Sequence, residues 1–236
     1  MQWQALLKEQ AEQLDISLND EQLEKFSLYS DLLRQWNERM NLTAITRPEE
    51  VAVKHFLDSL SPLRCIMPEQ GAAVIDVGTG AGFPGIPLLI VRPDIRLTLL
   101  DSLNKRLIFL QEVLRALSLD AQTVHARAEE AGRNPEFREQ YDIAVSRAVA
   151  PLNVLCEYCL PFVKPCGRFL AMKGPQAEEE IQASQHAVTA LSGMLEKTQA
   201  LSLPDGSGRT IVIIEKTRPL EKIYPRHGSK IAKKPL

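Results

Sequence analysis

The sequence predicts an α/β fold of the Rossmann-like class, built on a mostly parallel seven-stranded sheet that ends in an antiparallel hairpin. From residue 72 onward, short apolar runs alternate with amphipathic helical segments, which is typical of strand–helix–strand units with parallel strands. Only the glycine-containing loop 204–208 separates the last two runs. Because so short a loop joins neighbouring antiparallel strands, the sheet should finish in a hairpin.

Residues 1–70 are predicted to form a helical N-terminal extension. Apolar side chains recur at helical spacing in residues 3–14 and again in residues 20–38. Residues 46–49, Thr-Arg-Pro-Glu, resemble a capping box with an early proline, so a third helix should start there and run to Leu60. The chain therefore opens with three helices before its first strand.

Residues 71–216 should contain the core of the fold, followed by a basic C-terminal tail at residues 217–236. The clearest helix between two strands covers residues 103–117. One main domain is therefore expected. The seven expected strands are residues 73–77, 97–100, 122–125, 143–145, 168–172, 196–203 and 209–216.

The composition is that of a globular protein. Of the 236 residues, 44% are apolar and 25% are charged, which allows a full hydrophobic core. No run approaches the roughly 18 apolar residues that a membrane span requires. The N-terminus also lacks the basic and apolar regions of a signal peptide. We therefore expect a soluble cytoplasmic protein without a membrane partner, and separately we expect a monomer.

The four cysteines do not predict a metal site. Cys156, Cys159 and Cys166 lie close together, and such a trio can form a zinc knuckle or a redox pair. No second pair of ligands follows at the spacing of a tetrahedral site, since His186 stands alone in a polar stretch. Reduced thiols without a metal are therefore expected.

Basic side chains are concentrated at the end of the chain. Seven Lys or Arg and one acidic residue give residues 216–236 a net charge of +6, which leaves −8 on residues 1–215 because the whole chain carries −2. Such a segment fits contact with nucleic-acid phosphates, and a solvated tail without a partner is the alternative. The side chains predicted to contact RNA are Arg226, Lys230, Lys233 and Lys234.

A glycine-rich turn after the first predicted strand indicates a cofactor site. Residues 76–82 read Asp-Val-Gly-Thr-Gly-Ala-Gly, and glycines in such a turn let the backbone approach a ligand closely. Because dinucleotide, flavin and methyl-donor sites all use such glycines, Asp76 decides between them. Its carboxylate would oppose a pyrophosphate, whereas S-adenosyl-L-methionine has no phosphate and carries a cationic ammonium and sulfonium. The turn therefore predicts an S-adenosylmethionine site formed by Asp76, Gly78, Gly80 and Gly82.

Further acidic residues stand where other parts of this cofactor would bind. Asp101 ends the second predicted strand, where ribose hydroxyls arrive in such folds, and a helix cap is its alternative role. Ala128 and Glu129 follow the third strand, where adenine is expected, although Glu129 alternatively belongs to a solvated acidic surface.

The terminal hairpin also favours a class I methyltransferase over a dehydrogenase.

Residues after the fourth strand disfavour two common methylation chemistries. Amine methylation generally uses an Asn/Asp-Pro-Pro-aromatic motif there, but residues 146–151 read Ser-Arg-Ala-Val-Ala-Pro. Pyrimidine C5 methylation needs a cysteine nucleophile, and Cys156 and Cys159 are expected to point away from the strand edge. A ring nitrogen with its own lone pair, such as guanine N7, remains. It needs orientation and exclusion of water but no general base.

Short motifs along nearly the whole chain occur together in one family. They are Trp36-Asn37, Asn41-Leu42-Thr43, His55 to Ser59, Asp76 to Pro87, Leu99 to Ser102, Lys105-Arg106, Arg127 to Glu129, Ser146 to Ala148, Lys173-Gly174, Tyr224 to Arg226 and Lys234 to Leu236. In these motifs the chain resembles the bacterial ribosomal RNA small subunit methyltransferase G family, also called glucose-inhibited division protein B. It departs from the family at Asn104, where glycine is usual.

The resemblance implies an S-adenosylmethionine-dependent enzyme that methylates guanine N7 in 16S rRNA of the small ribosomal subunit. It implies cofactor contacts at Gly78, Phe83, Ala128, Glu129 and Arg147. A non-enzymatic rRNA-binding or assembly factor and a small-molecule methyltransferase of the same fold are the alternatives. The intact glycine turn disfavours the first of these, and the basic tail disfavours the second.

Four residues are further candidates for the acceptor site. By the resemblance, Arg147 and Lys173 should face the active site and hold an rRNA phosphate or guanine O6, with an ion pair to Glu129 or Asp101 as the alternative. His55 and Asp58 lie one helical turn apart, so they are expected to pair with each other. They either line the guanine pocket or only fix the N-terminal extension to the sheet.

Overall fold

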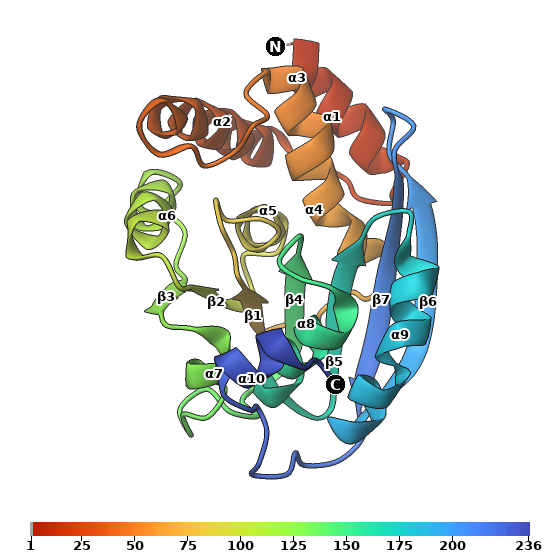
Figure 1. Cartoon of the computed structure of the whole chain (residues 1–236). Helices are drawn as coiled ribbons and strands as arrows, with labels where there is room; N and C mark the ends of the chain where they lie inside the picture. The colour runs from red at the N-terminus through yellow and green to blue at the C-terminus, as the bar shows by residue number, and fades with distance from the viewer. Residues whose placement is uncertain (1) are drawn as a thin grey trace.

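The computed structural model describes residues 2–236 and contains one seven-stranded sheet in the order β3-β2-β1-β4-β5-β7-β6 (Figure 1). Strands β1 to β5 run parallel, whereas β7 is antiparallel to β5, and β6 is antiparallel to β7. The predicted fold class is confirmed. The strands are β1 (Ala73–Val77), β2 (Arg96–Asp101), β3 (Gln122–His125), β4 (Tyr141–Arg147), β5 (Val163–Lys173), β6 (Gly193–Ser202) and β7 (Gly208–Lys216).

Helices cover both faces of the sheet. Successive strand side chains point to opposite faces, so Val74 and Ile75 of β1 belong to two separate buried apolar clusters. Within residues 2–236, no helix is long and apolar enough to cross a membrane. The helices are α1 (Gln2–Glu12), α2 (Asp20–Met40), α3 (Pro48–Val51), a π-helical turn (Ala52–Leu57), α4 (Asp58–Leu60), a 3₁₀ turn (Ser61–Arg64), α5 (Gly85–Val91), α6 (Asn104–Ala116), α7 (Ala128–Ala131), α8 (Leu152–Cys159), a second 3₁₀ turn (Leu160–Phe162), α9 (Ala177–Ala190) and α10 (Gly228–Lys233).

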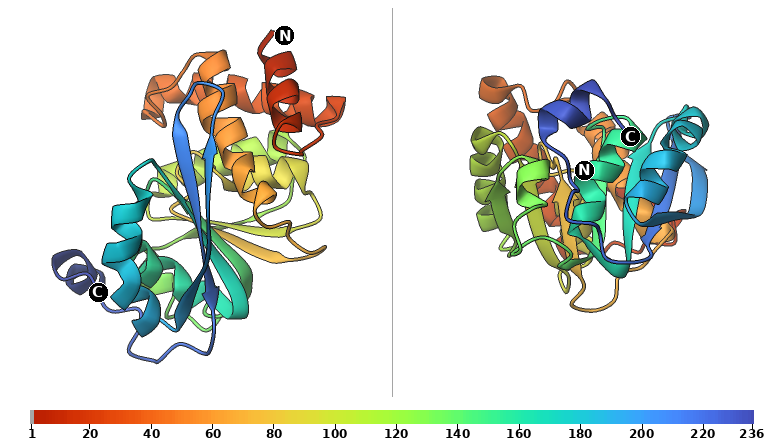
Figure 2. Two further views of the ribbon diagram at one scale, coloured as in Figure 1. Left: turned by 90° about the vertical axis from the view of Figure 1, so that its right-hand side faces the viewer. Right: turned by 60° about the horizontal axis from the view of Figure 1, so that its bottom comes forward.

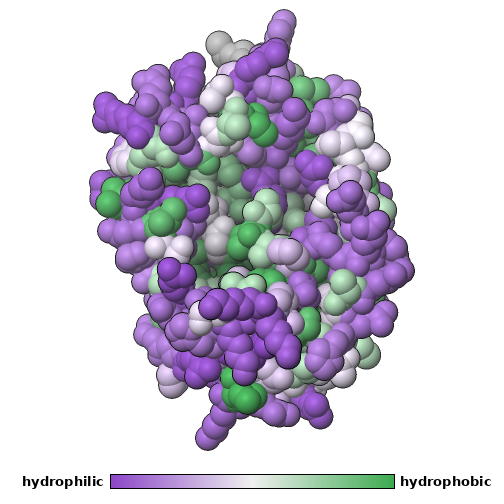
Figure 3. All heavy atoms as spheres, viewed as in Figure 1, coloured by the Kyte–Doolittle hydropathy of each residue, from purple (hydrophilic) through white to green (hydrophobic). Residues whose placement is uncertain are grey.

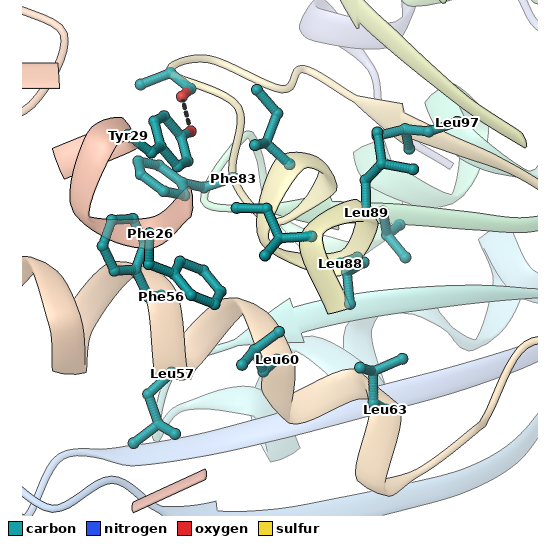
Figure 4. Close-up of a cluster of buried hydrophobic side chains, with 14 of the residues drawn as sticks. Phe26, Tyr29, Phe56, Leu57, Leu60, Leu63, Phe83, Leu88, Leu89 and Leu97 are labelled. Atoms are coloured by element: carbon teal, nitrogen blue, oxygen red, sulfur yellow. Dashed lines mark hydrogen bonds between the residues drawn. The ribbon is translucent and has the colours of Figure 1, made fainter. Parts of the chain in front are cut away.

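The N-terminal helices share one hydrophobic core with the sheet. Phe26 of α2 and Phe56 of the π-helical turn have no exposed surface, and their rings pack at a centroid distance of 4.9 Å. Figure 4 shows this cluster continuing into Leu88 of α5 and Leu97 of β2. Figure 2 shows that the tip of the β6–β7 hairpin also reaches these helices. Three distant parts of the chain thus share one buried apolar cluster, which includes Leu57, Leu97 and Leu203.

The third N-terminal helix runs to Leu60 as predicted, but its predicted capping box is wrong. The N-cap is Arg47, which makes no side-chain capping hydrogen bond, and Pro48 occupies the first helical position. Thr46 therefore lies one residue too early for its hydroxyl to reach the free N–H groups of the first turn. The fixed φ angle of Pro48 favours the start of the helix in place of a side-chain cap.

Residues 217–236, here called the C-terminal strap, pack against the protein. Arg138 donates hydrogen bonds to the carbonyls of Leu220 and Tyr224 at 3.0 and 2.8 Å, and Figure 1 shows α10 in front of α7 and α8. The expected RNA contact at Arg226 is not available, because its guanidinium is paired with the fully buried carboxylate of Glu157 at 2.7 Å. The pattern of basic residues could not reveal this partner, which lies 69 residues earlier.

Candidate active site

Two adjoining cavities open at the carboxyl ends of the parallel strands, around the turn between β1 and α5. Their volumes are about 460 and 150 Å³. Gly78, Asp101, Ser102 and Val149 line both of them, so together they form one recess. Ligands of open α/β sheets bind at this edge. On the face shown in Figure 3, apolar side chains gather near the centre and polar side chains surround them.

The glycine turn has backbone conformations that other residues rarely adopt. Gly78 and Gly80 have φ angles of +73° and +62°. A Cβ on Gly78 would lie 2.6 Å from a methyl carbon of Val149, the side chain that borders both cavities. The N–H of Gly80 donates to Oδ2 of Asp101 at 2.9 Å. The turn is therefore fixed to the end of β2 while its backbone faces the recess.

Asp101 anchors the glycine turn and borders the recess, but it does not cap α6, whose N-cap is Leu103 without a side-chain capping hydrogen bond. Besides Gly80, its carboxylate accepts a hydrogen bond from the backbone N–H of Leu103 at 2.9 Å and one from Arg106 at 3.3 Å. The first of these bonds fixes the residue before α6, and the carboxylate also borders both cavities. Asp101 thus holds the entry to the helix and stands in the position expected for a ribose contact.

Asp76 lies beneath the glycine turn and does not line the cavities. Its Oδ2 atom accepts hydrogen bonds from the hydroxyl of Thr79 at 2.7 Å and from the N–H of Gly85 at 2.9 Å. Oδ1 is buried and has no hydrogen-bond partner among the described residues. Burial raises the pKa of Asp76 to about 6, although both hydrogen bonds act in the opposite direction. Asp76 therefore holds the turn from below through Thr79 and Gly85 and does not reach the recess.

Gly82 and Phe83 connect the turn to the N-terminal helices. A Cβ on Gly82 would lie 2.6 Å from the hydroxyl of Tyr29, so this glycine serves close helix packing and lines neither cavity. Tyr29 donates a hydrogen bond to the carbonyl of Ala81, drawn as a dashed line in Figure 4. Phe83 borders the larger cavity and stacks on His55 at a centroid distance of 4.6 Å.

Arg147, at the end of β4, borders the larger cavity and is held by the N-terminal extension. Its guanidinium carbon lies 5.0 Å from the centre of the Phe83 ring. Nη1 donates to the carbonyl of Lys54 and to Oδ2 of Asp58, both at 3.0 Å. Nη2 lies 3.3 Å from Nδ1 of His55. These contacts use three of the five guanidinium N–H groups, so the side chain retains donors for a substrate.

The expected pairing of His55 with Asp58 is wrong, because both side chains contact Arg147 instead. Burial and the neighbouring Arg147 lower the pKa of His55 to about 4, so its imidazole is neutral at pH 7. Its Nε2 atom lies 2.8 Å from the hydroxyl of Thr43. The other oxygen of Asp58 accepts a hydrogen bond from Arg209 at 3.0 Å. Sequence analysis missed Arg209, since a partner 151 residues away leaves no local pattern.

Lys173 lies beside the recess but lines neither cavity. Its ammonium pairs with Glu180 at 2.7 Å and donates to the carbonyl of Ala150 at 3.0 Å. Glu180 also accepts a hydrogen bond from the N–H of Leu152 at 2.7 Å. The pair therefore fixes the loop after β4, which carries Val149. Lys173 thus forms a structural ion pair, but its partner is Glu180 and not Glu129 or Asp101, just as Arg147 pairs with Asp58.

Ala128 and Glu129 begin α7 and line the smaller cavity. Cys156 and Cys159 are fully buried in α8, and burial raises the pKa of both thiols, which disfavours a cysteine nucleophile. Among the described residues, no cluster of three or more His, Cys, Asp or Glu side chains could hold a metal ion.

Of the residues predicted to contact RNA, Lys230 lies on α10 and is exposed.

The chain is similar over its full length to curated proteins of one family. The family model of rRNA small subunit methyltransferase G matches residues 22–209. Ribosomal RNA small subunit methyltransferase G from Alkaliphilus metalliredigens is 50% identical over 100% of both chains. The protein of the same name from Symbiobacterium thermophilum is 51% identical over 99% of this chain and 98% of its own.

Solved structures share the fold at low identity. The M. jannaschii TYW2 structure in complex with AdoMet has a TM-score of 0.53 and 13% identity, covering 67% of this chain and 76% of its own. TrmN from Thermus thermophilus has a TM-score of 0.53 and 18% identity; 68% of this chain aligns with 48% of TrmN, about half its length. The full-length relatives and the family model show that this chain belongs to the rRNA small subunit methyltransferase G family.

Proposed function

We propose that the protein transfers the methyl group of S-adenosyl-L-methionine to N7 of a guanine in 16S rRNA of the small ribosomal subunit. The observation that carries this proposal is the recess formed by Gly78, Asp101 and Arg147 in a member of this family. The glycine turn lies where the two cavities meet, and the basic side chain of Arg147 borders the larger one.

The residues of the recess fit the cofactor. Gly78 presents backbone without a side chain, Asp101 offers a carboxylate for ribose hydroxyls, and Glu129 borders the cavity proposed for adenosine. When bound, S-adenosylmethionine supplies a methyl group on a sulfonium. Because S-adenosylmethionine has no phosphate, a carboxylate near the turn does not oppose its binding. The negative charge of Asp76 attracts its ammonium and sulfonium groups.

The chain's own residues orient the acceptor base. Guanine N7 has a lone pair in the plane of the ring, so attack requires no proton removal. His55 is neutral at pH 7 and holds the guanidinium of Arg147, whose remaining N–H groups can donate to guanine O6 or to a phosphate. Catalysis then depends on alignment and on exclusion of water by the wall that contains Phe83.

The test uses small subunits from cells that lack this protein, incubated with purified protein and S-adenosylmethionine carrying a labelled methyl group. After digestion to nucleosides, the label should appear as 7-methylguanosine. Label in another nucleoside or in metabolites would overturn the assignment in favour of different chemistry or a small-molecule substrate. Stable binding to the subunit without any transfer would instead indicate an assembly factor.

Small ribosomal subunits are the proposed partner, so we place the reaction in the cytoplasm. We propose that the protein acts as a monomer, because all of the recess residues named above come from one chain. Size-exclusion chromatography with light scattering should give a mass of about 26.4 kDa for the free protein.

The affinity for S-adenosylmethionine should rise with pH through the titration of Asp76. The pKa of Asp76 in the folded protein, about 6, lies above its ordinary value. The protonated carboxyl therefore contributes to the folding stability of the free protein below about pH 4, and this contribution is lost as the pH rises through 6. A cation binds preferentially to the ionised form. Calorimetry between pH 5 and 7 should show up to about tenfold tighter binding. An equally steep dependence in Asp76→Asn would contradict this assignment.

Three exposed lysines of the C-terminal strap are expected to contact rRNA phosphates. Replacing Lys230, Lys233 and Lys234 with glutamine should weaken binding to small subunits. Each lost phosphate contact should reduce the slope of log affinity against log salt by roughly 0.7 to 0.9. A control with two lysines replaced at Lys8 and Lys197, on α1 and β6, should keep the slope. An unchanged slope in the triple variant would mean that the strap makes no RNA contact.

A further inference from the structure

The C-terminal strap is attached to the part of the protein that carries the smaller cavity. Arg133 donates to the carbonyl of Pro225 at 2.8 Å, and Arg226 pairs with Glu157 in the interior. The carboxylate of Glu157 also accepts a hydrogen bond from the backbone N–H of Arg226 at 2.7 Å. Because Glu157 belongs to α8 and has no exposed surface, these bonds fix the strap at one position.

This position brings the start of α10 against Glu129. A Cβ built on Gly228 would lie 2.0 Å from Oε1 and 2.9 Å from Cδ of Glu129. Real Cβ atoms essentially never approach this closely, so only a glycine leaves the carboxylate in its present place. The φ angle of Gly228 lies outside the left-handed region, so its backbone conformation does not require glycine. The requirement comes from the carboxylate alone.

Glu129 is in turn a side chain of the recess. Only 9% of its surface is exposed, and it lines the smaller cavity together with Ala128 and Tyr158. Its carboxylate oxygens remain open to the smaller cavity, since they are not among the buried polar atoms that lack a partner. A ligand in that cavity can therefore supply hydrogen-bond donors to them. An adenosine group has such donors in its hydroxyls and its exocyclic amine.

We infer that Gly228 is a positioning residue for the cofactor, since it leaves room for the Glu129 carboxylate to face the smaller cavity. The inference rests on the proposed function, because it assigns that cavity to the adenosine end of S-adenosylmethionine. The C-terminal strap then forms the wall behind the cofactor site. It also carries the lysines proposed for RNA, so one short helix borders both binding surfaces.

The variant Gly228→Ala tests the inference. Its added methyl group must displace the carboxylate, so the Kd and KM for S-adenosylmethionine should rise about tenfold, whereas the affinity for small subunits should change less than twofold. The second variant, Gly228→Ala with Glu129→Asp, shortens the acidic side chain and makes room for the methyl group. It should bind the cofactor more tightly than Gly228→Ala alone. Gly174→Ala is the control, because a Cβ there would meet no atom within 4 Å.

The effect must pass through Glu129, and a double-mutant cycle measures this. In a Glu129→Ala background, Gly228→Ala should leave the cofactor Kd unchanged. The inference is overturned if Gly228→Ala binds the cofactor normally, if it lowers only the melting temperature, or if it weakens binding equally in both backgrounds. If Gly228→Ala does not fold, hydrogen exchange of the unmodified protein decides. Cofactor binding should then slow exchange in residues 226–233, and unchanged exchange would overturn the inference. Failure of the unmodified protein to bind S-adenosylmethionine would instead overturn the proposed function.

Discussion

Replacing Gly78 with valine is expected to weaken S-adenosylmethionine binding at least about 100-fold, equivalent to roughly 2.7 kcal/mol. Two effects combine at this position. The φ angle of +73° is unfavourable for a β-branched residue. The new side chain would also meet Val149, whose methyl carbon lies 2.6 Å from the ideal Cβ position. The displaced groups would then occupy the junction of the two cavities, where we propose that the cofactor binds.

Gly71→Val is the matched control for this experiment. Gly71 has nearly the same φ angle, +74°, but a Cβ there meets no atom within 4 Å. Both variants should therefore lose a similar stability of about 1–3 kcal/mol from backbone strain. Calorimetry should show normal cofactor affinity only for Gly71→Val. Normal affinity in a folded Gly78→Val protein would remove the basis for placing the cofactor at this turn.

Replacing Asp58 with alanine is expected to lower the free energy of unfolding by about 3 kcal/mol and to reduce methyl transfer. Its side chain is 4% exposed and pairs with Arg147 and Arg209, whose side chains are 14% and 22% exposed. Removal of the shared carboxylate leaves two partly buried cations next to each other. The melting temperature should fall by roughly 6–12 °C. Because Arg147 would also lose its support, kcat on small subunits should fall more than the affinity for S-adenosylmethionine.

Glu196→Ala provides the comparison with an ordinary ion pair. Glu196 pairs with Arg168 at 2.7 Å, but both side chains are more than a third exposed. Its removal should therefore change the free energy of unfolding by no more than about 1 kcal/mol and leave activity unchanged. Equal losses of stability in the Asp58 and Glu196 variants would show that the buried position of Asp58 has no special effect. Full activity in Asp58→Ala would exclude its role in placing Arg147.

The parts of the molecule that could be predicted from sequence depend on neighbouring residues. Strand alternation and a five-residue loop predicted the sheet and its hairpin, because both patterns act over a few residues. The recess could be located for a similar reason, since the Gly78 turn and Asp101 follow directly from two adjacent parallel strands. The strand before Lys173 was predicted too short: β5 begins at Val163, ahead of the glycine and proline that weaken its pattern.

Contacts between distant segments could not be predicted in this way. Asp58 and Arg209, which are bonded to each other, lie 151 positions apart in the sequence. Glu157 and Arg226 lie 69 positions apart. Each of these charged residues is compatible with an exposed surface when only its neighbours in sequence are considered. Composition therefore described Arg226 as part of a basic tail, whereas the buried carboxylate that binds it determines its actual position.

The shared carboxylate of Asp58 also affects how the site forms during synthesis. The ribosome produces the N-terminal helices and the glycine turn well before β7, and elements made early begin to fold early. Until Arg209 has been translated, Asp58 lacks one of its two cationic partners, and the strap that supports Glu129 comes later still. A nascent chain can thus assemble most of its sheet while the recess is still incomplete. The active site is therefore among the last parts of the protein to form.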